Sequence, residues 1–374
     1  MIDTENYCAM IHGGLHLDFK TKLPSAQNCC LRNELIPVDV TRNFWNDNNF
    51  IPLRELNKNN QLDDRCYNTC KKSELADMES FRTGMNQGLE TYGQTDIRGP
   101  ARIDLMFDIS CNLACRTCGT HSSTFWQKHL QENGMWTEPI FTPRSRSEVI
   151  SALSQLDLSN LKMLVFCGGE TLLGQEYWEV ARWLADNVPN ASQHLTLCFQ
   201  TNGTQFINEK YFEIIGRFHL VKLHVSLDAV DDQFHYLRWP ASWASVTENL
   251  LALREKLPSN VMFLIEETVS IFNLFYTHRL EQWVKQNFSC NREGDIVVHS
   301  RHLAQGVYGL QNCTQKYIDA LENDPRKNLI PKNWQENPVK IADMLEEIKK
   351  FDLLRSQSFQ QIFPEVSDFY RDYL

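Results

Sequence analysis

The feature that most constrains the fold is an alternation of two hydrophobic periodicities that begins near residue 100. Apolar runs of strand length predict six strands, over residues 102–109, 162–167, 194–200, 221–227, 261–269 and 295–300. Between them, apolar residues recur every three to four positions and predict helices over residues 147–156, 176–187, 209–217, 245–256 and 280–288. Such alternation implies βαβ units and a parallel sheet buried on both faces. Six repeats predict an α/β fold, a partial (β/α)6 barrel rather than a full eight-stranded one.

The segments on either side of this repeat are different in character. The first hundred residues show one short helical segment, over 52–57, and too few large apolar side chains for an independent core, so a metal centre is the expected substitute. After residue 305 the pattern turns helical over 315–321 and 341–351, and an aromatic tail over 359–370 is expected to pack back on the body. We therefore expect three parts, 1–95, 96–305 and 306–374.

Length, charge and hydropathy exclude several classes of protein. A chain of 374 residues, at roughly 150 per domain, is long enough for two or three domains. Its net charge of −10, without a Lys/Arg block, argues against general nucleic-acid binding. Asp3, Glu5 and Asp18 exclude a secretory signal, and no apolar run approaches the roughly 20 residues that cross a bilayer. The expected location is the cytoplasm, with no membrane attachment.

Twelve cysteines in a chain without an export signal indicate metal binding or redox chemistry rather than disulfides. Cys111, Cys115 and Cys118 follow directly after the first expected barrel strand, where parallel α/β folds place their chemistry. Three thiolates leave a four-coordinate zinc site incomplete, whereas a cubane iron–sulfur cluster held by three cysteines keeps one iron open to another ligand. Four scattered cysteines are expected to fill core positions: Cys167, Cys198, Cys290 and Cys313.

The run Cys111-Asn-Leu-Ala-Cys115-Arg-Thr-Cys118 resembles the cluster motif of the radical S-adenosylmethionine (SAM) enzymes. The resemblance covers roughly residues 100 to 300. It implies that a 4Fe-4S cluster binds SAM at its open iron, reduces it and yields a 5′-deoxyadenosyl radical that abstracts hydrogen from a substrate. It also implies a partner that supplies electrons, a reductase such as flavodoxin or ferredoxin.

The same resemblance suggests cofactor-binding residues at the ends of the later strands. Gly168, Gly169 and Glu170 resemble the family's glycine-glycine-glutamate motif, which binds the amino group of SAM. Asn202 lies in a polar strand end, Ser226 and Asp228 are expected to meet the ribose hydroxyls, and Arg238 resembles an arginine that faces the SAM carboxylate. On the fifth strand, three residues could reach cofactor or substrate: Thr268, Ser270 and Asn273. Thr117 and Thr171 depart from the family pattern, which usually has a large residue and a proline there.

The N-terminal cysteines resemble the ligand set of an auxiliary-cluster unit called the twitch domain, here placed before the barrel. The expected ligands of a second 4Fe-4S cluster are Cys8, Cys29, Cys66 and Cys70, and Ser80, Arg82 and Asn86 resemble the segment that follows in such units. Cys30 competes with Cys29, because neighbouring side chains on an extended segment point to opposite sides. The alternative is a zinc knuckle of Cys66 and Cys70 with His12 or His16, histidines that otherwise suit the surface of a hairpin.

The favoured function is a radical enzyme that acts on an unactivated C–H bond of a peptide or small molecule, with no catalytic side chain assigned. No hydride-cofactor fingerprint, phosphate-binding loop or paired-histidine protease motif suggests other chemistry. The alternative is a non-catalytic scaffold or binding protein stabilised by zinc or by clusters.

Overall fold

One curved sheet of nine strands organises the computed structural model, which describes residues 5–20, 23–32, 35–71, 74–75, 80–88, 98–288, 298–304, 306–332 and 334–373. The strand order is β3-β2-β1-β4-β5-β6-β7-β8-β9. The strands are β1 (Gly14–Asp18), β2 (Ser25–Gln27), β3 (Ile36–Pro37), β4 (Arg102–Asp108), β5 (Met163–Gly168), β6 (Thr196–Thr201), β7 (Leu220–Ser226), β8 (Val261–Val269) and β9 (Val298–Leu303).

Strands β4 to β9 are the six repeats expected from the sequence, and each pairs in parallel with the next. The helices that connect them are α6 (Thr124–Glu132), α7 (Arg146–Ser154), α8 (Gln175–Asn187), α9 (Ala191–His194), α10 (Phe212–Ile215), α11 (Asp231–Leu237), α12 (Trp243–Lys256) and α13 (Thr277–Phe288). The sheet stays open, so the α/β partial-barrel prediction is confirmed. Cys290 and the first residues of the last expected strand, 295–297, lie outside the described residues.

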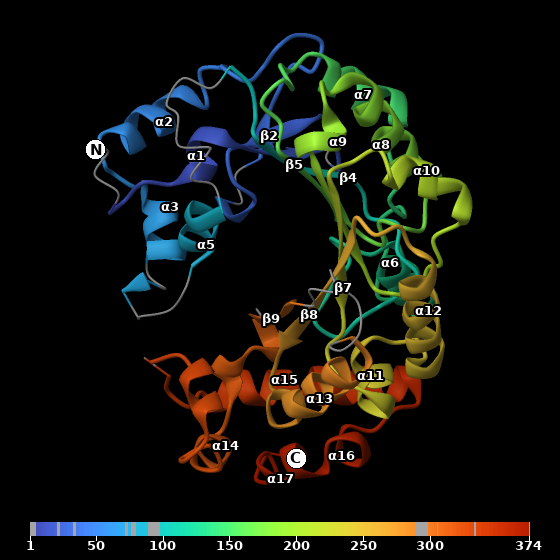
Figure 1. The fold of residues 1–374 in the computed structure, drawn as a ribbon. Coiled ribbons are helices and arrows are strands. Elements are labelled where there is room, and N and C mark those ends of the chain that lie inside the picture. Colours follow the sequence, from blue (N-terminus) through green and yellow to red (C-terminus); the bar gives the residue numbers. More distant parts are fainter. Residues whose placement is uncertain are drawn as a thin grey trace.

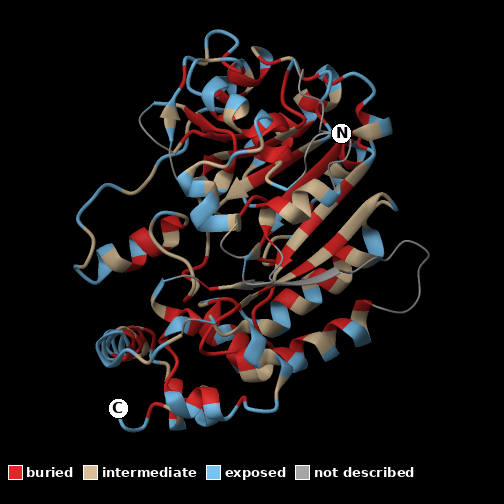
Figure 2. Cartoon of the chain, turned by 90° about the vertical axis from the view of Figure 1, so that its left-hand side faces the viewer, coloured by how far each residue is buried: buried red, intermediate tan, exposed pale blue. Residues whose placement is uncertain are grey.

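Helices cover the convex side of the sheet, and polar side chains line its concave side. Figure 1 shows α7, α8, α10 and α12 along the outer surface. In β7, Val221, Leu223 and Val225 are buried in the core beneath these helices, while the residues between them are only partly buried. Figure 2 shows this alternation of buried and intermediate residues along the strands. The concave face therefore receives every second side chain, and many of these are polar.

The N-terminal segment is less separate than expected. Strand β1 pairs in parallel with β4, from Gly14 opposite Arg102 to Asp18 opposite Met106, and antiparallel with β2. Leu15 and Leu17 enter the main core together with residues from the following loop, Phe44, Trp45 and Phe50. Strand β1 was not predicted, because polar residues occupy alternate positions of this fully buried strand and interrupt its hydrophobic pattern. The remaining N-terminal helices are α1 (Ala9–Gly13), α2 (Ile51–Lys58), α3 (Asp64–Cys66) and α5 (Phe81–Gly88), of which only α2 was expected.

The C-terminal part forms a second hydrophobic core, and its aromatic tail packs back on the body as expected. Its helices are α14 (Gln315–Asp319), α15 (Pro338–Arg355), α16 (Phe359–Ile362) and α17 (Pro364–Asp368). Tail residues such as Phe359, Phe363 and Tyr370 are buried against Phe272 and Tyr317. Among the described residues, no helix combines the length and apolarity needed to span a membrane.

Candidate functional site

The loop after β4 brings together the three cysteines of the motif. Burial raises the pKa of Cys111 to about 11 and the pKa values of Cys115 and Cys118 to about 12. Each thiol also lies close enough to another member of the set for that neighbour's negative charge to raise its pKa further. The loop therefore brings three partly buried thiols within electrostatic reach of one another.

Contacts from two later segments fix the course of this loop. The backbone N–H groups of Ala114 and Arg116 donate to the carbonyl oxygens of Trp239 and Leu237, at 2.8 and 2.7 Å. Ser123 caps α6 at the Trp126 N–H and donates its hydroxyl to the Leu113 carbonyl oxygen at 2.6 Å. The Trp126 indole N–H donates to the Cys115 carbonyl oxygen at 3.0 Å. The loop is thus held by its backbone, which leaves the thiols free to bind a metal group.

Glu170, just after β5, is a buried carboxylate at the centre of a hydrogen-bond network. It accepts bonds from Leu172 N (2.9 Å), Thr201 Oγ1 (2.8 Å) and Asn202 N (2.6 Å). Burial nevertheless raises its pKa to about 7, with the three hydrogen bonds and Arg238 opposing the rise. A carboxyl group that is 1% exposed with a pKa near neutrality is suited to binding a cation.

Gly168 and Gly169 are required by the close packing of the backbone around them. In the structure, a Cβ at Gly168 would lie 2.0 Å from the Asp108 carbonyl oxygen, and one at Gly169 would lie 2.2 Å from the Ser110 carbonyl oxygen. Gly168 also has a φ of +137°. The two glycines therefore allow the end of β5 to pack against the backbone that leads into the cysteine loop.

Asn202, after β6, connects Glu170 to the cysteine loop. Its backbone N–H donates to Glu170, while its side-chain amide donates to Asn112 Oδ1 at 3.0 Å and contacts Cys111 Sγ at 3.8 Å. The structure thus brings together three sequence-selected elements: the cysteine loop, Glu170 and the polar end of β6.

Asp228 and Arg238, both expected to contact cofactor, form a buried ion pair with each other. Arg238 Nη2 lies 2.9 Å from Asp228 Oδ1. Burial acts to lower the pKa of Arg238, but Asp228, Cys115 and Cys118 more than offset this and raise it. Among the described residues, Asp228 Oδ2 and Arg238 Nε have no hydrogen-bond partner. Each residue of the pair therefore has one buried polar atom that is available to bind another group.

The remaining strand-end residues divide into two groups. Ser226, at the end of β7, is partly exposed on the concave side. Ser270 and Asn273 are fully buried, and Asn273 Oδ1 accepts bonds from the Ser270 N–H and hydroxyl. The Asn273 amide donates to the carbonyl oxygens of Asp228 and Thr268. Ser270 and Asn273 therefore stabilise the backbone around Asp228.

The N-terminal cysteines are clustered by α2, α5 and the segment around residue 8. Cys8 and Cys29 are buried in one small core with Cys66 packed against it. Burial raises the pKa of Cys8 to about 11, Cys70 adds to the rise, and Arg82 opposes it. A hydrogen bond with the Cys30 thiol and burial raise the pKa of Cys29, and the nearby Cys8 adds to the rise. All four expected ligands therefore lie in one neighbourhood.

Residues from the segment after Cys70 hold Cys8 in place. Asn86 accepts a hydrogen bond from Ala9 N and donates to the Tyr7 carbonyl oxygen, at 2.9 and 2.8 Å. Arg82 Nη1 donates to the same carbonyl at 2.6 Å and pairs with Glu74. Ser80 also bonds Glu74. The segment of Ser80, Arg82 and Asn86 thus clamps the chain on either side of Cys8.

Cys30 lies beside Cys29 but also acts on residues of the concave face. Its negative charge acts on Arg102 and raises the pKa of Cys167, both on the concave face. Cys198 is buried there too, and burial raises its pKa to about 12, with Lys222 and Arg102 opposing the rise. Cys198 is buried and Cys313 lies in the C-terminal core, both as expected, whereas Cys167 is only partly buried; Cys167 and Cys198 both have charged neighbours.

The two N-terminal histidines are buried, contrary to the expectation of surface positions. His12 stacks on Tyr7 with ring centroids 5.3 Å apart, and its Nε2 lies 3.1 Å from Asn57 Oδ1. His16 is on the concave face of β1, and burial lowers its pKa. Within the described residues, no three His, Cys, Asp or Glu side chains are close enough to hold a single metal ion.

Sequence reasoning missed the charged residues of the concave face and of α15. His224 Nδ1 lies 2.6 Å from Glu266 Oε1, and Arg102 pairs with Asp104 at 2.8 Å. Arg116, inside the cysteine motif, pairs with Asp352 of α15 at 2.5 Å. The charged residues of the concave face could have been predicted in part, because polar residues occupy every second position of β7. No local pattern connects Arg116 to a helix more than 200 residues later.

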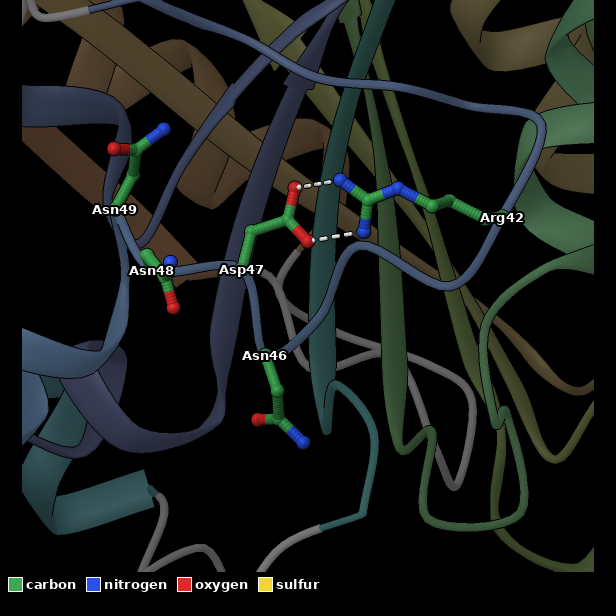
Figure 3. Close-up of a pocket in the computed structure, with 5 residues that line it drawn as sticks. All are labelled: Arg42, Asn46, Asp47, Asn48 and Asn49. Carbon is green, nitrogen blue, oxygen red and sulfur yellow. Dashed lines mark hydrogen bonds and ion pairs between the residues drawn. The ribbon is translucent and has the colours of Figure 1, made fainter.

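A polar pocket of about 540 Å³ lies on the N-terminal segment and contains none of the expected site residues. It is lined by Arg42, Asn46, Asp47, Asn48 and Asn49, and Figure 3 shows Arg42 paired with Asp47. Arg54 donates to Asn46 Oδ1 at 3.0 Å. The two charged residues that line the pocket, Arg42 and Asp47, are therefore already paired with each other.

The cysteine loop fits an iron–sulfur group by its donor chemistry. Soft thiolate ligands favour iron–sulfur clusters, and three of them on one loop match a cluster with one iron open. The positively charged Arg238 acts on both Cys115 and Cys118. The four N-terminal thiols fit a fully ligated cluster on the same chemical ground.

Comparison with known proteins identifies the region around this loop. Residues 109–273 match the family described as the Radical SAM superfamily. No curated protein matches the chain.

Several solved structures resemble the chain at low identity. A histidine-tagged anSMEcpe with bound AdoMet is 16% identical, with a TM-score of 0.36, over 68% of this chain and 61% of that one. Streptococcus suis SuiB bound to S-adenosylmethionine is 12% identical, with a TM-score of 0.38, over 97% and 75% of the two chains. SuiB bound to the precursor peptide SuiA is 11% identical, with a TM-score of 0.38, over 96% and 75%. The chain thus spans less than two thirds of the first of these structures.

Proposed function

With residues 109–273 matching the Radical SAM superfamily, we propose that this chain is an enzyme that cleaves SAM reductively and removes hydrogen from a substrate. Cys111, Cys115 and Cys118 would hold the 4Fe-4S cluster. One observation carries the proposal: the three thiols lie together at the carboxyl end of β4, connected through Asn202 to the buried acid Glu170. When bound, the cluster and SAM supply a 5′-deoxyadenosyl radical.

The chain's own residues bind and orient SAM in this proposal. Glu170 accepts the ammonium of the methionine part, because a buried carboxylate forms a strong charge-assisted bond with a cation. Asp228 Oδ2, buried without a hydrogen-bond partner among the described residues, accepts from a ribose hydroxyl beside Ser226. Arg238 donates from Nε to the cofactor carboxylate, while its Nη2 remains paired with Asp228. Gly168 and Gly169 keep Glu170 against the cysteine loop.

Cys8, Cys29, Cys66 and Cys70 hold a second 4Fe-4S cluster in the same proposal. The neighbourhood of the four thiols and the clamp from Arg82 and Asn86 support this assignment. Cys29 is preferred to Cys30 because Cys29 shares the core of Cys8, whereas Cys30 acts on the concave-face residues Arg102 and Cys167. The segment 1–95 is the auxiliary unit, joined to the barrel of 96–305 through β1, and 306–374 is a helical extension.

The substrate is a polar molecule, a peptide or a small metabolite. Its site is the concave face, where charged groups of both signs are present: Asp104, Lys222, His224 and Glu266. Lys222 has an electrostatic effect on Cys198 and no ion-pair partner among the described residues, which suits a substrate carboxylate. A flavodoxin or ferredoxin would supply the electrons.

The test is the formation of 5′-deoxyadenosine from SAM under dithionite in anaerobically reconstituted protein. We expect slow formation by the wild type and none by a variant with Cys111, Cys115 and Cys118 changed to Ala. A colourless, zinc-containing wild type that forms no 5′-deoxyadenosine would contradict the proposal and favour a metal-stabilised scaffold.

A further inference from the structure

Arg355, the last residue of α15, is a buried guanidinium without a hydrogen-bond partner. The residue is 6% exposed, and Nε, Nη1 and Nη2 all lack a partner within the described part of the chain. Burial, helped by the neighbouring charge of Arg116, lowers its pKa to about 9. An unpaired buried charge is costly, so a site of this kind is normally completed by an anion.

Aromatic rings offset only part of that cost. The guanidinium carbon lies 4.6 Å from the ring centroid of Trp126, 4.9 Å from Trp239 and 5.1 Å from Phe351. Cation–π contacts favour a guanidinium over bare apolar burial, but they do not neutralise its charge. The rings therefore orient Arg355 and leave it positively charged.

The neighbouring arginine, Arg116, already has a carboxylate partner. Asp352 Oδ1 accepts from Arg116 Nη2 at 2.5 Å and from the Tyr236 hydroxyl at 2.8 Å, while Oδ2 accepts from Phe359 N at 2.6 Å. Asp352 therefore neutralises Arg116, whereas Arg355 has no hydrogen-bond partner among the described residues. One positive charge is left over beside the cysteine loop.

The excess charge faces Cys115. The indole of Trp126, under the Arg355 guanidinium, donates to the Cys115 carbonyl oxygen at 3.0 Å. Ala114 and Cys118 pack in one cluster with Phe351 and Leu354, from the same turn of α15. Arg355 and Cys115 lie close enough to interact electrostatically. A thiol that binds metal gives up its proton, so the group at Cys115 becomes an anion.

We infer that Arg355 is the fixed positive charge against which the cluster of Cys111, Cys115 and Cys118 is reduced, so that the C-terminal helix sets the reduction potential of that cluster. This rests on the proposed function and extends it to a residue outside the matched region, 109–273. Reduction transfers one electron from an added donor such as dithionite to the oxidised cluster, with no bond made or broken. The reduced state carries one more negative charge, which a nearby cation in a low dielectric stabilises. Arg355 therefore makes the cluster easier to reduce.

The test is an anaerobic redox titration of the reconstituted protein, followed by electron paramagnetic resonance. The signal of this cluster is the one that is absent when Cys111, Cys115 and Cys118 are all changed to Ala. Arg355→Met removes the charge and keeps a long side chain, Arg355→Lys keeps the charge, and Lys349→Met removes an exposed charge from the same helix. We expect Arg355→Met to shift the reduction equilibrium about tenfold toward the oxidised state, which is about 59 mV for one electron. Lys349→Met and Arg355→Lys should stay near the wild type.

Each other outcome is decisive. An unchanged midpoint in Arg355→Met overturns the inference while leaving the proposed function intact. If Arg355→Met loses this cluster and Arg355→Lys keeps it, the result supports a role for the positive charge. If both variants lose the cluster, the inference is overturned, because Arg355 then acts through packing. A wild type that lacks this signal contradicts the proposed function itself.

Discussion

Glu170 is a buried acid whose charge is sensitive to pH near neutrality. Its carboxylate accepts three hydrogen bonds from the β5 and β6 ends, and burial still raises its pKa to about 7. The acid is therefore protonated below neutrality and ionised above it. A bound ammonium requires the ionised form, so in the proposed SAM site binding would have to expel this proton at low pH.

We expect SAM affinity, measured by calorimetry, to weaken as the pH falls below about 7, by up to tenfold per pH unit. Glu170→Gln should lose about 1.5–3 kcal/mol of binding, roughly ten- to a hundredfold, because it removes a charge-assisted bond. Its remaining affinity should depend less on pH over this range. Iron content should be unchanged, since Glu170 is not a cluster ligand.

The matched control is Glu176→Gln, which removes an exposed carboxylate from the first turn of α8. It should bind SAM like the wild type. If Glu170→Gln binds SAM with unchanged affinity and an unchanged pH profile, the end of β5 is not part of the cofactor site.

At the scale of elements, the site depends on how closely the ends of β4 and β5 approach. The Glu170 N–H donates to the Ser110 carbonyl oxygen at 2.8 Å, directly before Cys111. This contact is possible only because residue 169 has no Cβ. The glycines thus act on the geometry of the cysteine loop from the neighbouring strand.

Gly169→Ala should destabilise the protein by about 1–3 kcal/mol in denaturant unfolding, because its Cβ would meet the Ser110 carbonyl oxygen at 2.2 Å. Gly216→Ala is the control. A Cβ there meets its nearest atoms at 3.6 and 3.7 Å, so the change should be neutral or stabilise by about 0.4–1 kcal/mol. Equal stability of the two variants would show that the end of β5 can move away from the cysteine loop without cost.

The sequence predicted elements whose apolar pattern is local and missed those whose pattern is set by the rest of the fold. Strands β4 to β9 and their helices have strong periodicity, and spacing alone selected Cys111, Cys115 and Cys118. Strand β1 was not predicted, because its alternate residues His16 and Asp18 are polar yet buried on the concave face.

Site residues show the same division. Glu170 and Asn202 stood out by family resemblance and lie together in the structure. Arg355 could not be predicted, because the reason for its position is a contact with a loop some 240 residues earlier along the chain. A buried arginine in a helix has no sequence signature unless its partner is known.

At the scale of the whole molecule, segments from both ends of the chain converge on the barrel. The N-terminal segment adds β1 to β3 to the sheet and gathers Cys8, Cys29, Cys66 and Cys70 near the amino ends of β1 and β4. The C-terminal helices lie at the other end of the curve, and α15 reaches the cysteine loop (Figure 1). The two thiol sets are therefore built by different parts of the chain, so each should lose its metal independently.

The most direct test of this account is the iron content of three anaerobically reconstituted proteins. Two 4Fe-4S clusters give the wild type about eight irons. The variant with Cys111, Cys115 and Cys118 changed to Ala should keep about four, and so should the variant with Cys66 and Cys70 changed to Ala. Iron that stays near eight in the triple variant, or a wild type that never exceeds about four, would contradict the assignment of two separate clusters.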